Sequence, residues 1–208
     1  MAITIDGSSG IASVDGSAGS PSVRGTDANS GILYTADAIK FSTGGVQRAV
    51  IDNNGLSSAG HILQVLQNLK RDTTSSSSTS YVDTGLEQAI TPASTSNKIL
   101  IQYSIMFSTA SSSIPSPFTQ IVRGGSAITG AFPSDTSVSQ YGTTTNFNEG
   151  NTSVWTAMTY LDSPSTTSET TYKIQYRVDG GSAVHINKYH NQDNYTCISQ
   201  MTLMEVAG

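Results

Sequence analysis

Histidine and cysteine are the side chains of this 208-residue chain whose types most readily bind metals or act as nucleophiles. The histidines are His61, His185 and His190, and the one cysteine is Cys197. His185 and His190 stand five residues apart, so a regular strand would place them on opposite faces. Because no cysteine or glutamate completes a ligand set beside them, we expect no metal site. We interpret Cys197 as a small core side chain.

The chain also lacks the usual sequence motifs of hydrolases. The chain has no Gly-x-Ser-x-Gly turn, which presents the nucleophilic serine of many hydrolases. Sugar cleavage requires two closely placed carboxylates. Six acids instead fall in predicted turns or loops, where we expect them to be solvated: Asp135, Glu149, Asp162, Glu169, Asp179 and Asp193. We therefore expect no enzymatic activity and no cofactor.

Two segments combine aromatic side chains with amides and hydroxyls, a composition that suits sugar stacking or protein contact. The first is a predicted loop, 132–150, which contains Phe132, Tyr141 and Phe147. The second, 188–195, contains Tyr189, His190 and Tyr195. Both are candidate recognition surfaces. The alternative is that these aromatic rings only anchor their own loops.

The composition limits the class of protein that must position these residues. Charged residues are 12% of the chain, against roughly 25% in ordinary soluble domains. Serine and threonine exceed a quarter of the residues, and the net charge is −5 with no basic stripe, so we expect no nucleic-acid partner. We find no run of 18 apolar residues and no signal peptide, and so expect no membrane insertion. Frequent Thr, Val, Ile and Tyr without helical periodicity predict an all-β protein.

The N-terminal region, 1–60, contains a ladder of short apolar runs between residues 25 and 55. The runs at 31–34, 38–41 and 46–51 are each closed by glycine- or asparagine-rich turns. We expect strands of two or three residues here, which bury too little apolar surface to fold alone. This region therefore predicts an assembled structural protein, in which neighbouring chains complete the stem.

The second region, 61–208, has longer strand patterns. Residues 98–110 alternate Ile99, Ile101, Tyr103, Ile105 and Phe107 with a mixed set, which predicts a long strand in a packed sandwich. Segment 61–69 fits a helical stripe or a bent strand, and we favour the strand. Shorter strands are predicted at 81–84 and 86–90, and a hairpin turn at 179–182. Together these patterns predict an antiparallel β-sandwich of jelly-roll type.

Two groups of motifs resemble bacteriophage virion proteins. The first is Thr26-Asp-Ala-Asn-Ser-Gly-Ile-Leu-Tyr34, followed by Ile39-Lys-Phe-Ser-Thr-Gly-Gly-Val-Gln-Arg48 and Val50-Ile-Asp-Asn-Asn-Gly55. The second includes Ile62-Leu-Gln-Val-Leu-Gln67, Tyr81-Val-Asp-Thr-Gly-Leu86, Thr171-Tyr-Lys-Ile-Gln-Tyr176 and Thr202-Leu-Met-Glu-Val-Ala-Gly208. On these motifs the chain is similar to virion fibre and capsid decoration proteins, especially those of marine and cyanobacterial phages.

The resemblance implies a homotrimer with a sandwich head, located on the virion surface after assembly in the host cytoplasm. Candidate contacts between the copies are Tyr34, Phe41, Tyr103, Trp155 and Tyr176, although the aromatic residues of the head could also be core. Two placements are open. In one, a surface fibre attaches by its N-terminal region to capsid or tail proteins, and its head binds a host glycan. In the other, a decoration or cement protein stabilises the shell.

Overall fold

The computed structural model describes residues 16–53, 55–109, 115–132, 142–145, 147, 151–180, 182–190 and 192–208. The chain divides into two compact units. The first, which we call the stem, is Met1–Leu63 with Ala207–Gly208, and the second, the head, is Gln64–Val206. The sequence alone places the boundary between the two regions at residue 60.

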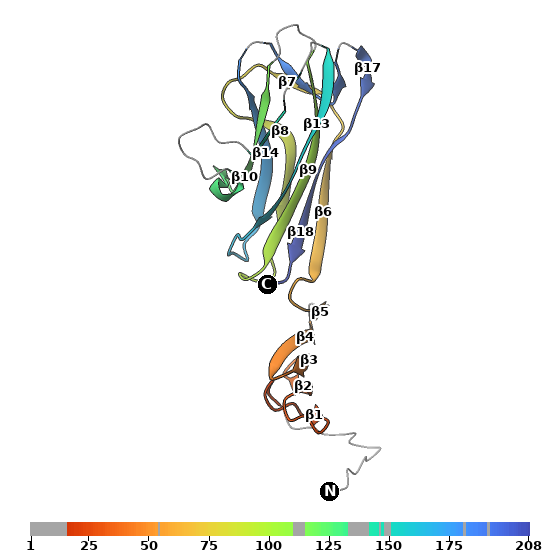
Figure 1. Ribbon diagram of the computed structural model, residues 1–208, viewed down its shortest axis with the longest axis vertical. Coiled ribbons are helices and arrows are strands. Elements are labelled where there is room, and N and C mark those ends of the chain that lie inside the picture. The colour runs from red at the N-terminus through yellow and green to blue at the C-terminus, as the bar shows by residue number, and fades with distance from the viewer. Residues whose placement is uncertain are drawn as a thin grey trace. The chain divides into compact units, whose positions relative to one another are not determined.

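Five antiparallel strands pair in chain order to form the stem sheet (Figure 1). They are β1 (Val23–Arg24), β2 (Gly31–Thr35), β3 (Ala38–Thr43), β4 (Val46–Asp52) and β5 (Gly55–Ser57). The central three have five to seven residues, so the expectation of two- or three-residue strands is wrong for them. Residues with positive φ reverse the chain between them: Asp37 at 59° after β2, and Gly44 and Gly45 at 60° and 75° after β3.

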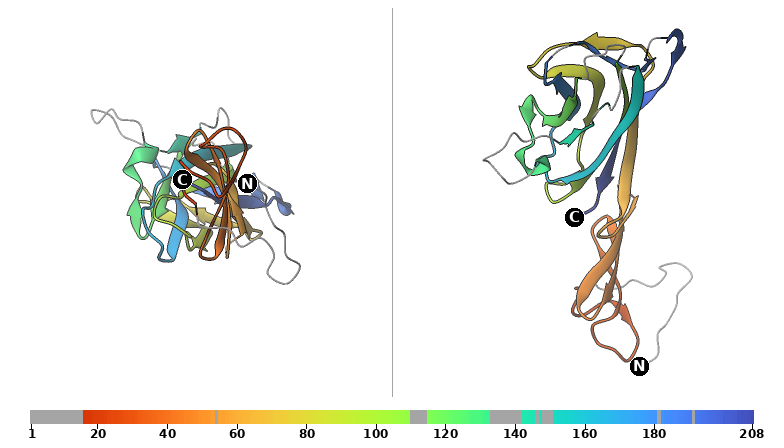
Figure 2. Two further views of the ribbon diagram at one scale, coloured as in Figure 1. Left: turned by 90° about the horizontal axis from the view of Figure 1, so that it is seen from below. Right: turned by 45° about the horizontal axis from the view of Figure 1, so that its top comes forward.

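The head is a sandwich of two antiparallel sheets, which Figure 2 shows from two directions. The β9 sheet contains β6 (Ile62–Lys70), β18 (Ser199–Val206), β9 (Lys98–Thr109), β15 (Val184–Ile186), β7 (Thr74–Ser76) and β13 (Thr152–Asp162). The β14 sheet contains β11 (Ser126–Ala127), β10 (Pro117–Arg123), β14 (Thr170–Val178), β8 (Val82–Ile90) and β12 (Thr143–Thr144). A 3₁₀ turn, η1 (Thr129–Ala131), follows β11, and a hairpin of β16 (Lys188–Tyr189) and β17 (Gln192–Thr196) precedes β18. The predicted all-β sandwich is confirmed.

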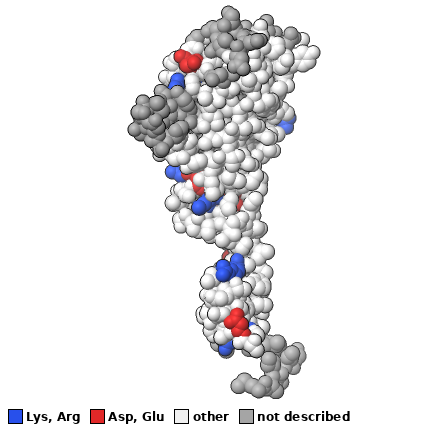
Figure 3. All heavy atoms as spheres, viewed as in Figure 1, with Lys and Arg blue, Asp and Glu red and all other residues white. Residues whose placement is uncertain are grey.

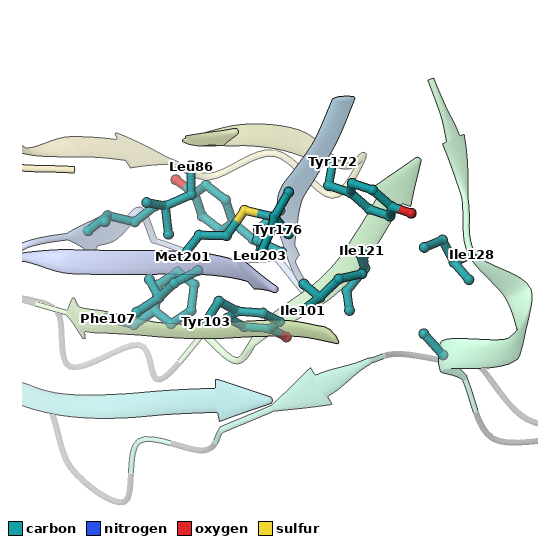
Figure 4. Packing of buried hydrophobic residues seen from close by; sticks show 14 of the residues in the cluster. Leu86, Ile101, Tyr103, Phe107, Ile121, Ile128, Tyr172, Tyr176, Met201 and Leu203 are labelled. Atoms are coloured by element: carbon teal, nitrogen blue, oxygen red, sulfur yellow. The ribbon is translucent and has the colours of Figure 1, made fainter. Parts of the chain in front are cut away.

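Alternate residues of β9 form one side of the head core. Ile99, Ile101, Tyr103, Ile105 and Phe107 are each at most 3% exposed, as the sequence pattern predicts. They pack against side chains from the facing sheet, and the rings of Phe107 and Tyr176 lie 5.4 Å apart. Figure 4 shows Ile101, Tyr103 and Phe107 of β9 on the side of the core opposite Leu86 and Tyr172. One continuous apolar cluster therefore holds the two sheets together.

Several predicted elements differ in detail from the structure. Segment 61–69 is a strand, as favoured, but the two short strands predicted at 81–84 and 86–90 form one strand, β8. Gly85, at φ 87°, lets β8 continue through a register shift opposite β14. The hairpin predicted at 179–182 is wrong, because β14 pairs with β10 and β8 whereas β15 pairs with β7 and β9. The chain passes from one sheet to the other at this turn.

Asp162 corrects the expectation of solvated acids. It ends β13 with its side chain 5% exposed, and its carboxylate accepts hydrogen bonds from Arg123 Nη1 at 2.7 and 2.8 Å. Tyr172 donates a third bond at 2.7 Å. Burial, followed by this bond to the carboxylate, raises the pKa of Tyr172. The cluster ties β13 to the β14 sheet and has a structural role. Asp135 and Glu149 lie outside the described residues.

Glu205 is the basis of a stability prediction. Its side chain is buried in β18 and accepts hydrogen bonds from the backbone nitrogen of Ala93 at 2.7 Å and from Asn97 and Gln64 at 2.6 Å each. Replacing Glu205 with Ala should destabilise the head by about 3 kcal/mol, because the buried Asn97 amide and two less buried donors lose a charged acceptor. Urea unfolding of the full chain measures this change. Glu87→Ala is the control, since Glu87 is exposed and pairs only at the surface; equal losses in both variants would contradict the prediction.

Candidate interaction surfaces

Two adjacent rows on one face of the stem sheet consist entirely of apolar and aromatic side chains. The strand register sets them in two rows, Val23, Ile32, Phe41 and Ala49 in one, and Tyr34, Ile39, Ile51 and Leu56 in the other. We call these eight side chains the stem face. Successive residues of a strand point to opposite sides, so alternate positions of β2, β3 and β4 contribute to it. Thr43, which accepts a hydrogen bond from Arg48 at 3.0 Å, follows Phe41 on the same side beyond the two rows. No charged or amide side chain interrupts either row.

The stem face is exposed in the single chain. Leu56 is 56% exposed, and Val23, Ile39, Phe41 and Ile51 are between 37% and 49% exposed. The opposite face is mixed: it carries Arg24, Lys40, Ser42, Gln47 and Ser57 together with the apolar residues Leu33 and Val50. Among the described stem residues, the buried ones are Pro21, Leu33 and Ser42, and none of these belongs to the stem face. A contiguous exposed apolar face of this kind marks an interaction surface.

The hairpin of β16 and β17 gathers three of the predicted recognition residues. The Tyr189 and His190 rings lie 4.1 Å apart at a tilt of 47°, and Tyr195 meets Tyr189 edge-on at 6.1 Å. Tyr195 is 63% exposed and Tyr189 is 42% exposed, while His190 is half-buried. The three side chains form one cluster at the surface, which we call the aromatic hairpin, and their role in recognition stays a prediction. Exposed, mutually supported rings suit stacking against a sugar or a protein side chain.

Asn187 fixes where this hairpin leaves the β9 sheet. Its backbone has φ 61°, a conformation that asparagine tolerates better than most residues. Its fully buried side chain donates to the backbone oxygens of Lys70 at 2.8 Å and Asp72 at 3.1 Å, and accepts from Ser199 at 2.6 Å. The backbone nitrogen of His190 donates to Ser153 at 3.2 Å. The aromatic hairpin is thus held at the end of β9 that carries Ser108, where β9 pairs with β15 and β13.

The second predicted recognition surface, in the loop 132–150, is not formed as expected. Phe147 is 2% exposed and belongs to the head core, so its assignment as a surface residue is wrong. Phe132 is half-buried, directly after η1. Tyr141 lies outside the described residues. Phe147 therefore anchors its own loop, which is the alternative that the composition left open.

The candidate contacts between copies fall into two groups. Tyr34 and Phe41 lie on the stem face, and Trp155 is 56% exposed on β13, so all three are available to a partner. Tyr103 and Tyr176 are 3% and 1% exposed, and the prediction that they contact another copy is wrong. The Tyr103 hydroxyl bonds Thr119 at 2.8 Å inside the sandwich. Burial raises the pKa of Tyr176 to about 12.

The described ranges offer few features of other kinds of site. No three histidine, cysteine, aspartate or glutamate side chains lie there in an arrangement that could hold a metal ion. Cys197 is a free, half-buried thiol rather than a core side chain. The same residues contain no helix with the length and apolarity to span a membrane. The candidate surfaces are therefore the stem face, the aromatic hairpin and the outer faces of the head.

Comparison with known proteins adds no relative. No family model matches the chain, and no curated protein matches it either. The function proposed below is therefore inferred from the surfaces just described.

Proposed function

We propose that this chain is a non-enzymatic structural protein of a bacteriophage virion. In this proposal it forms a homotrimeric surface fibre, whose N-terminal region attaches to a capsid or tail protein and whose head is exposed for binding to the host surface. The observation that carries the proposal is the stem face, because a one-layer sheet with eight aligned apolar side chains is stable only when that side is covered.

Three copies around an axis would cover each stem face with those of its neighbours. Each buried square ångström of apolar surface stabilises the assembly by roughly 25 cal/mol. The opposite face, which carries Arg24 and Lys40, would point away from this contact. Assembly would thus supply the core that the stem lacks within one chain, in agreement with the resemblance of its motifs to virion fibres.

The aromatic hairpin supports the role proposed for the head. Within the head, the polypeptide enters at Gln64 and leaves at Val206, and Val206 pairs with Lys98 at the first residue of β9. The hairpin is anchored near Ser108, ten residues further along that strand, or about 33 Å away. The clustered rings are therefore presented far from the points where the chain enters and leaves the head, and a surface glycan of the host is the proposed ligand.

The test is the oligomeric state of the full chain, measured by sedimentation equilibrium. We expect the mass of a trimer for the natural sequence and a large loss of association for Phe41→Asp, which places a charge in the stem face. Lys40→Asp is the control, because Lys40 lies on the same strand and faces the other way. A natural chain that sediments as a monomer, with stem amides already protected from hydrogen exchange, would contradict the proposal.

The place of the protein in the particle is tested separately. Binding of the isolated trimer to host cells or their surface polysaccharide supports the fibre, and a copy number near the tail symmetry agrees with it. Binding to undecorated capsids, with hundreds of copies per particle, would instead identify a decoration or cement protein. Hydrolysis of a host polysaccharide would contradict the non-enzymatic assignment.

A further inference from the structure

The outer faces of the two head sheets differ sharply in charge. On the β14 sheet, Lys173 pairs with Asp83 at 3.3 Å and with Glu87 at 2.9 Å. Gln175 also donates to Asp83 at 2.7 Å, and the Arg177 guanidinium lies 4.7 Å from the centre of the Phe118 ring. This side has the ion-paired character of a surface adapted to water. Figure 3 shows how few charged side chains the described surface carries in the view drawn there.

The outer face of the β9 sheet carries no charge over its central rows. Register aligns Leu161, Leu100 and Met204 in one row, Thr159, Gln102 and Thr202 in the next, and Ala157, Ser104 and Gln200 in a third. Trp155 continues this face on β13, and Val65, Gln67 and Leu69 continue it on β6, where Gln67 bonds Gln200. We call this surface the β9 outer face.

The charged residues of the same strands lie outside the central rows of the β9 outer face. Asp162, Glu205 and Lys70 are each at most 5% exposed and belong to the opposite, inward set of positions. Lys98 is exposed, but it lies at the first position of β9, paired with Val206 beyond the rows. The side that faces water in a single chain is therefore the side with the fewest charges.

The shape of the β9 outer face is uneven. Bulky apolar side chains lie at its borders: Val65 and Leu69 on β6 are 55% and 37% exposed, and Trp155 and Leu161 on β13 are 56% and 45% exposed. Its middle is a hollow of about 260 Å³ lined by small or uncharged residues, including Ser104, Ala157 and Thr202. Bulky apolar side chains beside a small-residue hollow give this face a relief against which side chains of a partner can pack.

We infer that the β9 outer face is a contact between the heads of neighbouring copies of this chain. The inference rests on the proposed homotrimer and assigns it a second interface, separate from the stem face. The distribution of charge on the head indicates which partner covers the β9 outer face. An uncharged face meets an identical face without like-charge repulsion, whereas docking against the β14 sheet would strip water from the Lys173 ion pairs.

The area of the β9 outer face determines how strongly we expect it to hold two copies together. Four strands about 4.8 Å apart and seven residues of about 3.3 Å each give a projected area of roughly 400 Å² per copy. A standard stable interface buries about 800 Å² per partner. The β9 outer face therefore strengthens an association that the stem face begins, and its disruption weakens the trimer without abolishing it.

The test compares one substitution on the two outer faces. In the full chain, Ala157→Arg places a charge in the hollow of the β9 outer face, and Ala89→Arg places the same charge on the outside of the β14 sheet. We expect Ala157→Arg to lower the association constant at least about tenfold, a change of about 1.4 kcal/mol. Ala89→Arg should leave it unchanged. Near-UV circular dichroism checks that both heads are folded.

Trp155 gives a second readout, because it is the only tryptophan of the chain. Its ring is more than half exposed in one copy, so its emission should shift to longer wavelength when the natural trimer is diluted until it dissociates. Trp155→Ala adds no charge and should also weaken association, which keeps the inference testable if Ala157→Arg fails to fold.

Three results would overturn the inference in distinguishable ways. Equal association of Ala157→Arg, Trp155→Ala and the natural chain would remove this interface and leave the stem-based trimer standing. Intact self-association with loss of incorporation into particles would assign the face to another virion protein. A natural chain that never self-associates would reject the proposed homotrimer together with this interface.

Discussion

Replacement of Ile101 with Asp is expected to leave the head unfolded at neutral pH. Ile101 is fully buried at the middle of the sandwich, with Tyr160 of β13 on one side in register and Leu203 of β18 on the other. Its side chain belongs to an apolar cluster that offers no cation to the new carboxylate. An unpaired buried charge costs several kcal/mol, and whole domains are stable by only about 5–15 kcal/mol.

Loss of the near-UV circular dichroism signal and of cooperative thermal unfolding measures the effect. Lys98→Asp is the matched control, because it introduces the same carboxylate at an exposed position of the same strand. Ile101→Val should cost only about 1 kcal/mol, since it removes one methylene without adding charge. If Ile101→Asp unfolds cooperatively within a few degrees of the natural chain, the described core is wrong.

Replacement of Gly44 and Gly45 with Val in one variant is expected to unfold the stem and to prevent assembly. The two glycines have φ of 60° and 75°, where a β-branched side chain is strained. A Cβ on Gly44 would meet no atom within 4 Å, and one on Gly45 would make only ordinary contacts. The penalty is therefore conformational, about 1–2 kcal/mol per residue or more for valine, in a sheet with little core of its own.

Hydrogen exchange of stem amides, together with sedimentation of the full chain, measures this second effect. Gly25→Val is the matched control, since Gly25 has no positive φ and a Cβ there also meets nothing within 4 Å. The control should assemble as the natural chain does. Normal protection of the stem in the double variant would show that the turn between β3 and β4 does not need glycine.

The sequence was most informative where one periodicity ran without interruption. The alternation through β9 predicted both the strand and its buried face, because a strand between two neighbours and under a second sheet must be apolar on one side. The sequence also shows Tyr189, His190 and Tyr195 within one short segment, although it does not predict the hairpin. Its three rings are close in the chain, so a short hairpin is enough to bring them together.

Other features depended on contacts between distant residues. Phe147 and Asp162 stand in polar surroundings in the sequence, yet the fold buries both, the second because Arg123 and Tyr172 reach it from the other sheet. The stem face was only partly predicted, through Tyr34 and Phe41. Its other members alternate visibly within β3 and β4, but the two rows appear only once the register of the strands is known.

The neighbouring positions of β6 and β18 have a consequence for biosynthesis. Gln64 and Glu205, separated by 141 positions, share a hydrogen bond of 2.6 Å across these strands. The head sheet cannot close until nearly its last strand has left the ribosome, whereas the stem meander joins only consecutive segments. The stem segments therefore leave the ribosome first, and the stem face stays uncovered while the head is still being translated. Cells that make this protein at high level should therefore accumulate chaperone-bound nascent chains, and head closure should precede the joining of copies.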